Sequence, residues 1–109
     1  MQALASALPG RFEIYALDVA DHAAQQQAAQ EFCARHGAPD LVIANAGISV
    51  GTLGDDPSDM AKLLRLLEVN VAGLAATLAA FAPAMRAERR GILCGISSVA
   101  GFRGLPGAG

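Results

Sequence analysis

Two apolar runs of this chain end in small polar residues that could hydrogen-bond a ligand. Residues 41–44 lead into Asn45-Ala46-Gly47, and residues 92–96 lead into Ser97-Ser98. Buried parallel strands read as near-continuous apolar runs, and ligands of open α/β sheets bind beyond the carboxyl ends of the strands. We therefore expect an amide, two hydroxyls and a closely approachable backbone to meet at one sheet edge, where they could orient and polarise a small molecule.

The composition favours a globular chain and argues against a nucleic-acid-binding one. The sequence has 109 residues, the length of one small domain, with 53% hydrophobic and 17% charged residues. Small domains bury a limited fraction of their surface, so this apolar content suggests a part of something larger. The formal net charge of −2 and the scattered arginines argue against a nucleic-acid partner.

Nothing in the sequence points to a membrane, a signal peptide or a metal. No uninterrupted apolar run is long enough to span a bilayer, and the first residues lack the basic region of a signal peptide. Cys33 and Cys94 match no metal or redox motif, so we expect buried thiols in a reducing compartment. His22 and His36 flank a predicted helix without metal-like partners, and Asp55-Asp56 fits a loop and helix cap. These features predict a cytoplasmic protein without metal or membrane partner.

Strand and helix signals alternate along the chain. Asp21 is the expected cap of one helix, which Gly37 ends, and Asp56 with Pro57 is the expected start of the next. Alternating strands and helices predict an α/β fold with a parallel sheet. The predicted strands are residues 12–19, 41–44 and 92–96, and the predicted helices are residues 2–8, 22–36 and 58–90.

The last predicted helix is long and carries an apolar stripe. At 1.5 Å per residue it would extend roughly 50 Å, so we expect a bend or break, for which Val69-Asn70-Val71 and Gly73 are the weak helix formers. The stripe should pack on the sheet, but part of the stripe could instead pack against a partner subunit in a homo-oligomer. The spacing of the apolar residues is the same in both cases and does not distinguish them. The stripe consists of Leu64, Leu67, Val71, Leu74, Leu78, Phe81 and Met85.

Four motifs, in this order and at these separations, resemble the classical short-chain dehydrogenase/reductase family. They are Asp18-Val19, Asn45-Ala46-Gly47, Asn70 within its Glu-Val-Asn-Val-Ala-Gly segment, and residues 95–101 (Gly-Ile-Ser-Ser-Val-Ala-Gly). The resemblance covers essentially the whole chain. It implies a Rossmann-type doubly wound parallel sheet, of which three strands lie here, and hydride transfer between NAD or NADP and a small-molecule carbonyl or secondary alcohol.

The resemblance also implies a role for each motif. Ser98 would be catalytic and would polarise the substrate oxygen, while Asn70 would hold a water in a proton relay. Asp18-Val19 would contact the adenine ring, Asn45-Ala46-Gly47 would line the cofactor site, and Ile48 would lie near the substrate. From the residues alone, the aspartate could also form an Asx turn, and the asparagine at the strand end could brace neighbouring strands.

Two parts of the family pattern are absent from the sequence. No Gly-x-x-x-Gly-x-Gly precedes Phe12, and no Tyr-x-x-x-Lys follows Ser98, because Tyr15 and Lys62 are the only tyrosine and lysine. We therefore expect residues 1–109 to be the central part of one NAD(P)-binding domain, incomplete at both ends and inactive alone. A non-catalytic nucleotide-binding regulator or scaffold on the same fold stays open. A methyltransferase-like domain would not account for the serine motif.

Overall fold

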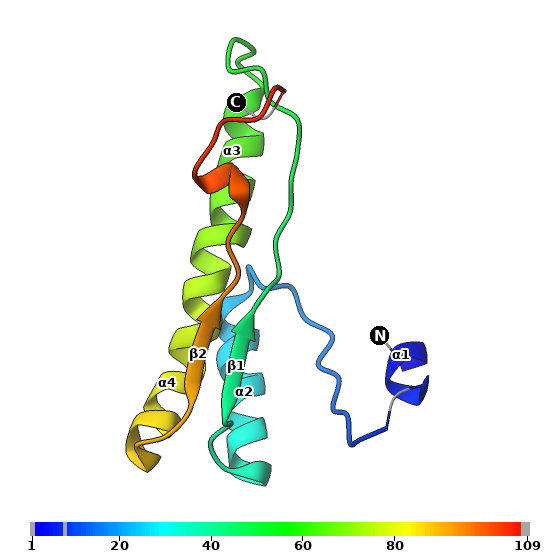
Figure 1. The fold of residues 1–109 in the computed structure, drawn as a ribbon, viewed down its shortest axis with the longest axis vertical. Helices are drawn as coiled ribbons and strands as arrows, with labels where there is room; N and C mark the ends of the chain where they lie inside the picture. Colours follow the sequence, from blue (N-terminus) through cyan, green and yellow to red (C-terminus); the bar gives the residue numbers. More distant parts are fainter. Residues whose placement is uncertain (1, 8, 108–109) are drawn as a thin grey trace.

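The computed structural model describes residues 2–7 and 9–107, and its centre is a two-stranded parallel sheet (Figure 1). β1 (Leu41–Ala44) pairs with β2 (Ile92–Gly95), and Ala44 lies opposite Gly95, so both strands end at the same level. Pairing continues for one step, because Ile96 N donates to Ala44 O at 2.9 Å. The predicted strands at 41–44 and 92–96 and the parallel α/β class are confirmed.

The predicted strand at residues 12–19 is wrong. Residues 11–18 are extended, but they pair with no strand in the described part of the chain (Figure 1). In the doubly wound order 3-2-1-4-5-6 the third and fourth strands are not neighbours, so this segment has no adjacent ladder to join. α1 (Gln2–Ala7) precedes it, and residue 8, also predicted as helical, lies outside the described residues.

α2 (His22–His36) forms where the sequence predicts it. The Asp21 side chain accepts a hydrogen bond from a first-turn backbone N–H at 3.0 Å, and Gly37 ends the helix at φ +79°. α2 packs alongside α4, where Phe32 and Phe81 meet edge to face with ring centroids 6.0 Å apart. The local cap signals therefore predicted both ends of this helix.

Residues 59–88 form one helical rod with a change of winding in the middle (Figure 1). α3 (Asp59–Leu67) leads through the π-helical segment η1 (Glu68–Gly73) into α4 (Leu74–Glu88). The break predicted near Asn70 is therefore present as a π-helical segment. π-Helical segments of this kind are rare and frequently occur at functional sites.

The predicted start of this helix is too early. Ser58 is the residue that precedes the first helical position, Asp59. Asp56 closes a preceding turn instead, because its Oδ1 accepts from Ser58 N at 2.8 Å and its carbonyl accepts from Asp59 N at 2.9 Å. The side chain and the carbonyl of Asp56 thus both serve this turn, and the α-helix begins after it.

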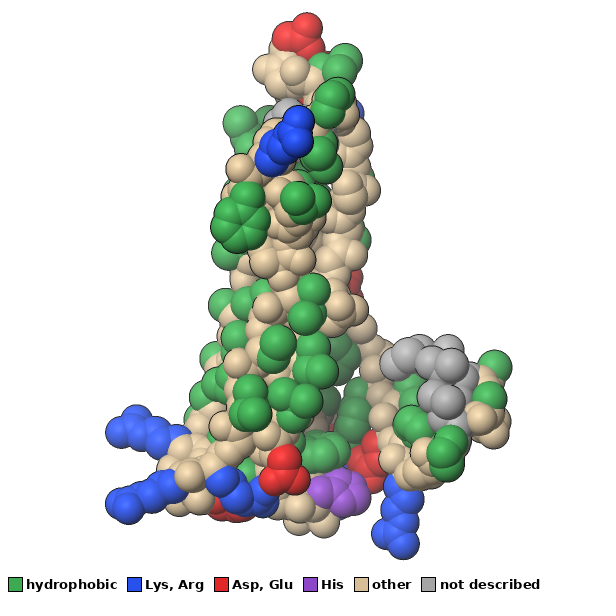
Figure 2. Space-filling model, viewed as in Figure 1, with side chains coloured by type: hydrophobic (Ala, Val, Ile, Leu, Met, Phe, Trp, Pro, Cys, Tyr) green, Lys and Arg blue, Asp and Glu red, His purple; other side chains and the backbone are tan. Residues whose placement is uncertain are grey.

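α4 covers one face of the sheet. Val42 and Ala44 of β1 are buried, whereas Leu41 and Ile43, which point the other way, are 50% and 53% exposed. The core consists of Ala38, Val42 and Met85, with Leu78, Phe81 and Ala84 packed against it. Figure 2 shows the opposite side, where hydrophobic side chains lie uncovered over the strands.

The apolar stripe of the helical rod divides into two parts. Its C-terminal half packs on the sheet, as expected. Its N-terminal half is open, because Leu64, Leu67 and Val71 are 59%, 47% and 58% exposed. Packing on the sheet therefore explains the C-terminal half of the stripe. The contact with a partner subunit that was considered for the N-terminal half stays a prediction.

The rod also passes a length and hydropathy test for a membrane-spanning helix. Asp59–Glu88 is a continuous helix of 30 residues with a window of mean hydropathy 1.5. The expectation from the sequence rested on uninterrupted apolar runs only, whereas this test averages hydropathy over a window of the helix. Only 17% of that window is buried in the described structure, and the part that packs on β1 and β2 belongs to α4.

Gly91, between α4 and β2, accepts no side chain. Its φ is +111°, and a Cβ would lie 2.2 Å from Met85 Cε and 3.0 Å from Pro39 O. We expect Gly91→Ala to lower the free energy of unfolding of the protein that carries this chain by about 1–3 kcal/mol, measured by chemical denaturation. Gly104→Ala is the matched control, since a Cβ there meets nothing within 4 Å. Equal losses in the two variants would contradict this reading.

Candidate functional site

The polar residues at the two strand ends line one pocket beyond the carboxyl edge of the sheet. Its volume is about 580 Å³, and its walls come from the end of β1, from η1 with the start of α4, and from the end of β2. The lining residues are Asn45, Ala46, Gly47, Ile48, Asn70, Leu74, Gly95, Ile96, Ser97, Ser98 and Gly101. The structure thus brings together every site residue predicted from the sequence except Asp18 and Val19.

Asn70 fixes the backbone of Ile48. Its Oδ1 accepts from Ile48 N at 2.8 Å, and its Nδ2 donates to Ile48 O at 2.9 Å. The loop passes closely here, because a Cβ on Gly47 would lie 3.4 Å from Asn70 Oδ1. Both ends of the amide therefore hold one wall of the pocket against η1, and a relay water on this residue stays a prediction.

Ser98 follows β2 with an extended backbone and an exposed side chain. Its Oγ accepts from Ala100 N at 3.2 Å at the start of a single 3₁₀ turn, η2 (Val99–Gly101). This bond uses a lone pair of the oxygen, so in the described structure the O–H can still donate to a ligand. A hydroxyl placed in this way can polarise a carbonyl oxygen.

Asp18 lies in the turn before α2, and its carboxylate is bound by the protein. Oδ1 accepts from Ala20 N at 2.9 Å and Oδ2 accepts from the Arg65 guanidinium at 2.8 Å. The hydrogen bonds from the Ala20 backbone and from Arg65 hold the pKa of Asp18 below its usual value. The Asx turn considered for this residue is therefore present, and contact with a cofactor stays a prediction.

Val19 lies beside the main pocket, in a smaller one of about 140 Å³ that it shares with Asn45 and Ala46. Its carbonyl is bound by Gln25, a buried residue of α2 that the sequence analysis missed. Three consecutive glutamines look alike in the sequence. Only the packing of α2 against α4 shows that the first is buried and that Gln26 is exposed.

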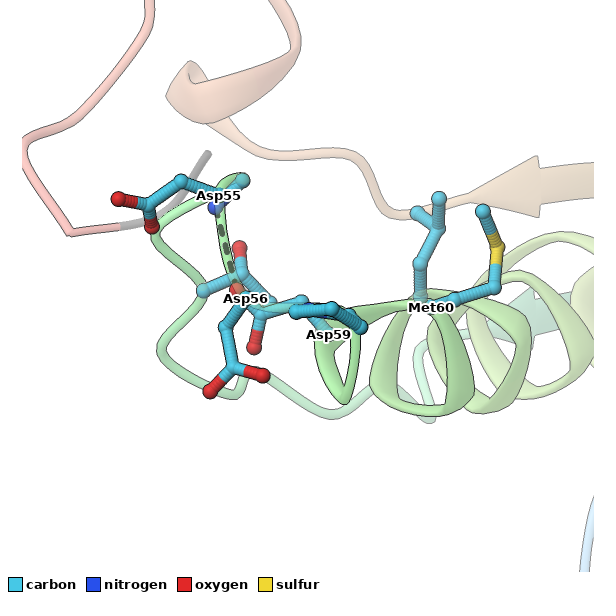
Figure 3. Close-up of a pocket in the computed structure, with 8 residues that line it drawn as sticks. Asp55, Asp56, Asp59 and Met60 are labelled. Carbon is cyan, nitrogen blue, oxygen red and sulfur yellow. Dashed lines mark hydrogen bonds between the residues drawn. The ribbon is translucent and has the colours of Figure 1, made fainter.

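A separate pocket of about 390 Å³ lies at the tip of the rod (Figure 3). Figure 3 shows Asp55 and Asp56 on the turn before α3. Asp59, at the start of α3, is buried, and its carboxylate accepts from Leu53 N at 2.7 Å and from Lys62 Nζ at 2.6 Å. The hydrogen bond from the lysine and two backbone N–H groups lower the pKa of Asp59 to about 2. This carboxylate anchors the loop that leads from the main pocket.

We expect the anchoring by Asp59 to depend on pH. The folded carboxyl has a pKa of about 2 and the unperturbed one a pKa of 3.8, so the unfolded state takes up the proton first as the pH falls. The stabilisation is complete above about pH 4 and is lost toward about pH 2. In the full-length protein, Asp59→Asn should therefore lower the midpoint of thermal unfolding near neutral pH. The difference in midpoint between the variant and the wild type should shrink below about pH 4.

Circular dichroism melts across this pH range measure the effect, with Asp55→Asn as the exposed control. The control should stay close to wild type at every pH. A difference between Asp59→Asn and wild type that does not change with pH would contradict the role of the ionised carboxylate.

The chain's tyrosine and lysine lie outside the main pocket. The Tyr15 hydroxyl donates to Glu13 at 2.9 Å and accepts from Arg35, whereas Lys62 binds Asp59. Glu13 also binds His36 at 2.8 Å. Among the described residues, no cluster of His, Cys, Asp and Glu side chains could hold a metal ion. The main pocket thus has a polarising hydroxyl, but neither of these side chains can deliver a proton in it.

Comparison with known proteins identifies the family of this chain. The family model for short chain dehydrogenases matches residues 1–109. The chain belongs to the short-chain dehydrogenase family. It is 42% identical over 91 residues to an uncharacterized oxidoreductase of Myxococcus xanthus, a match that covers 84% of this chain and 36% of that protein. The resemblance inferred from the motifs is confirmed.

Solved short-chain dehydrogenases share the fold. One from Streptomyces avermitilis superposes with a TM-score of 0.82 and 33% identity, over 97% of this chain and 39% of that one. A gluconate 5-dehydrogenase from Burkholderia cenocepacia, solved with NADP and tartrate, gives a TM-score of 0.73 and 34% identity over 84% of this chain and 36% of that one. The chain thus has the Rossmann-type architecture of the short-chain dehydrogenases and spans just over a third of the length of these relatives.

Proposed function

We propose that the protein carrying this chain is an NAD(P)-dependent oxidoreductase acting on a small carbonyl or secondary alcohol. Residues 1–109 would form the central part of its single cofactor-binding domain. The observation that carries the proposal is the common pocket of Asn45-Ala46-Gly47, Asn70 and Ser98 beyond two parallel strands. The NADP complex of the gluconate 5-dehydrogenase supports a nicotinamide cofactor, and the proposal covers NAD and NADP alike.

The residues present fit an elongated ligand along this edge. Ala46 and Gly47 leave the backbone open to close approach. The main pocket and the smaller pocket share Asn45 and Ala46, so the lining continues from Ser98 to Val19. A bound nicotinamide dinucleotide would supply the hydride, with its adenine toward Asp18.

The roles proposed for the side chains follow from their hydrogen bonds. Ser98 would donate its O–H to the substrate oxygen and stabilise the negative charge that develops when a carbonyl becomes an alkoxide. Asn70 would keep Ile48 in place beside the substrate. Because Tyr15 and Lys62 lie outside the pocket, the proton would come from a residue beyond this chain.

A non-catalytic nucleotide-binding regulator on the same fold is the second candidate, because the pocket at the strand ends would suit a bound nucleotide with or without turnover. The test is to assay the full-length protein with NADH or NADPH and a panel of ketones and aldehydes, following the nicotinamide absorbance. Oxidation of the cofactor with one of these substrates supports the enzyme. Saturable binding without turnover of any of them would favour the regulator, and failure to bind either cofactor would overturn both.

Residues 1–109 alone are expected neither to bind NAD(P) nor to turn over substrate. In the described part of the chain one sheet face and the outer strand edges are uncovered, and parallel sheets are stable with both faces covered. Thermal unfolding of the isolated chain, followed by circular dichroism with and without NADH or NADPH, tests this, with the full-length protein as control. Cooperative unfolding with a midpoint that rises on addition of cofactor would contradict the expectation.

We further propose a cytoplasmic homo-oligomer that binds neither nucleic acid nor membranes. The net charge of −2 gives no attraction for phosphates. The exposed side chains of Leu64, Leu67 and Val71 form an apolar surface that suits a second copy of the protein. Sedimentation velocity of the full-length protein, with Leu67→Glu as the interface variant, tests the oligomer. A wild-type monomer would contradict it.

A further inference from the structure

Gln25 is a buried polar side chain that the family motifs leave unexplained. It lies on α2 and is 6% exposed. Its Nε2 donates to Val19 O and lies 3.4 Å from Gly73 O, while its Oε1 lies 2.6 Å from Thr77 Oγ1. The opposite amide orientation would place an oxygen against two carbonyl oxygens, so the hydrogen bonds fix the orientation. This one side chain therefore joins the turn before α2, η1 and α4.

The bond to Val19 fixes the Val19–Ala20 peptide. The carbonyl of the Val19–Ala20 peptide is bound by Gln25 Nε2, and the N–H of the same peptide donates to Asp18 Oδ1 at 2.9 Å. Rotation of this peptide would break one of the two hydrogen bonds that hold the carboxylate, the other being the bond from Arg65. Gln25 thus acts on Asp18 through a single peptide plane.

The other contacts of Gln25 tie this turn to the rod that carries Asn70. Gly73 is the last residue of η1, and a Cβ there would lie 3.0 Å from Val19 O. Thr77 Oγ1 also lies 2.8 Å from Gly73 O, and its single proton serves one acceptor at a time. The turn and the rod are therefore in direct contact, with Gln25 and Thr77 closing the junction.

We propose that Gln25 is a positioning residue for the adenine end of the cofactor site, acting through the Val19–Ala20 peptide on Asp18. The inference rests on the proposed function. Gln25 lines a separate pocket together with Val19 and is not among the residues around Ser98. Its loss should therefore weaken cofactor binding and leave the chemical step unchanged.

Steady-state kinetics of the full-length protein at saturating carbonyl substrate test this. Gln25→Leu should raise the KM for the cofactor about tenfold, because the Val19 carbonyl loses its donor, with kcat close to wild type. Gln26→Leu, on the exposed side of the same helix, is the matched control and should keep the wild-type KM. Thr77→Val should raise KM by a smaller factor, and Thr77→Ser, which keeps the hydroxyl, should restore it.

An unchanged KM in Gln25→Leu would overturn the inference, as would a fall in kcat with KM unaltered. If Gln25→Leu does not fold, Thr77→Val and Thr77→Ser decide, and equal KM values in these two would overturn it. A wild-type protein that binds neither NADH nor NADPH refutes the proposed function, and the inference with it. That outcome is read from the wild type alone and cannot be confused with a failure of the inference.

Discussion

Replacing Ser98 by alanine is expected to lower kcat for carbonyl reduction by the full-length protein about 100- to 1000-fold. The hydroxyl lies beyond the end of β2 in the common pocket, with its oxygen held by Ala100 N, and among the described residues its O–H can still donate to a ligand. Donation to the substrate oxygen becomes stronger as negative charge develops there, so its loss acts on the chemical step. The KM for the cofactor should stay near the wild-type value. Initial rates at saturating cofactor and substrate measure the effect.

Ser97→Ala is the matched control for this experiment. Ser97 lines the same pocket, but its Oγ lies near Gly101, within 3.6 Å of where a Cβ would be. Its removal should change kcat only slightly. Equal losses in the two variants, or a Ser98→Ala protein with the wild-type kcat, would contradict the assigned role.

Replacing Asn70 by leucine is expected to impair both stability and activity. Leucine has a similar size but leaves the N–H and carbonyl of Ile48 without the partners they have at 2.8 and 2.9 Å. Because the loop is partly exposed, we expect a loss of about 1–2 kcal/mol in the free energy of unfolding. The pocket wall beside the substrate would also move, so kcat/KM should fall about tenfold or more.

Chemical denaturation and steady-state kinetics of the full-length Asn70→Leu protein measure the two effects. Glu68→Gln is the control on the same π-helical segment, where the side chain forms an exposed ion pair with Arg65. It should be close to wild type in both measurements. An Asn70→Leu protein with wild-type stability would show that its bonds to the Ile48 backbone contribute nothing.

The elements with local signals could be predicted from the sequence. α2 begins after the Asp21 cap and ends before Gly37, and both residues act within one turn of the chain. β1 and β2 were predicted as apolar runs with small polar ends. The segment 12–19 has the same composition as a strand, but a strand needs a neighbour, and none lies beside it among the described residues. Whether a segment pairs depends on the strands that lie beside it in the sheet, and the composition of the segment itself carries no information about them.

The residues of the site also divide into those with a signal in the sequence and those whose role depends on packing. Asn45, Asn70 and Ser98 carry a family pattern and were found from it, and the structure gathers them around one pocket. Gln25 and Asp59 were not found, because their importance depends on burial against segments distant in the sequence or across a turn. A glutamine in a run of three and an acid at a helix start both read as surface residues until packing is known.

The binding of a nicotinamide dinucleotide at the edge beyond β1 and β2 is tested most directly by fluorescence titration of the full-length protein with NADH and NADPH. We expect saturable binding of one of them, weakened at least about tenfold in Gly47→Val, because the added side chain enters the pocket beside Asn70. Gly104→Ala should bind as the wild type does. Saturable binding of neither cofactor, or equal affinity in wild type and Gly47→Val, would contradict a cofactor site at this edge.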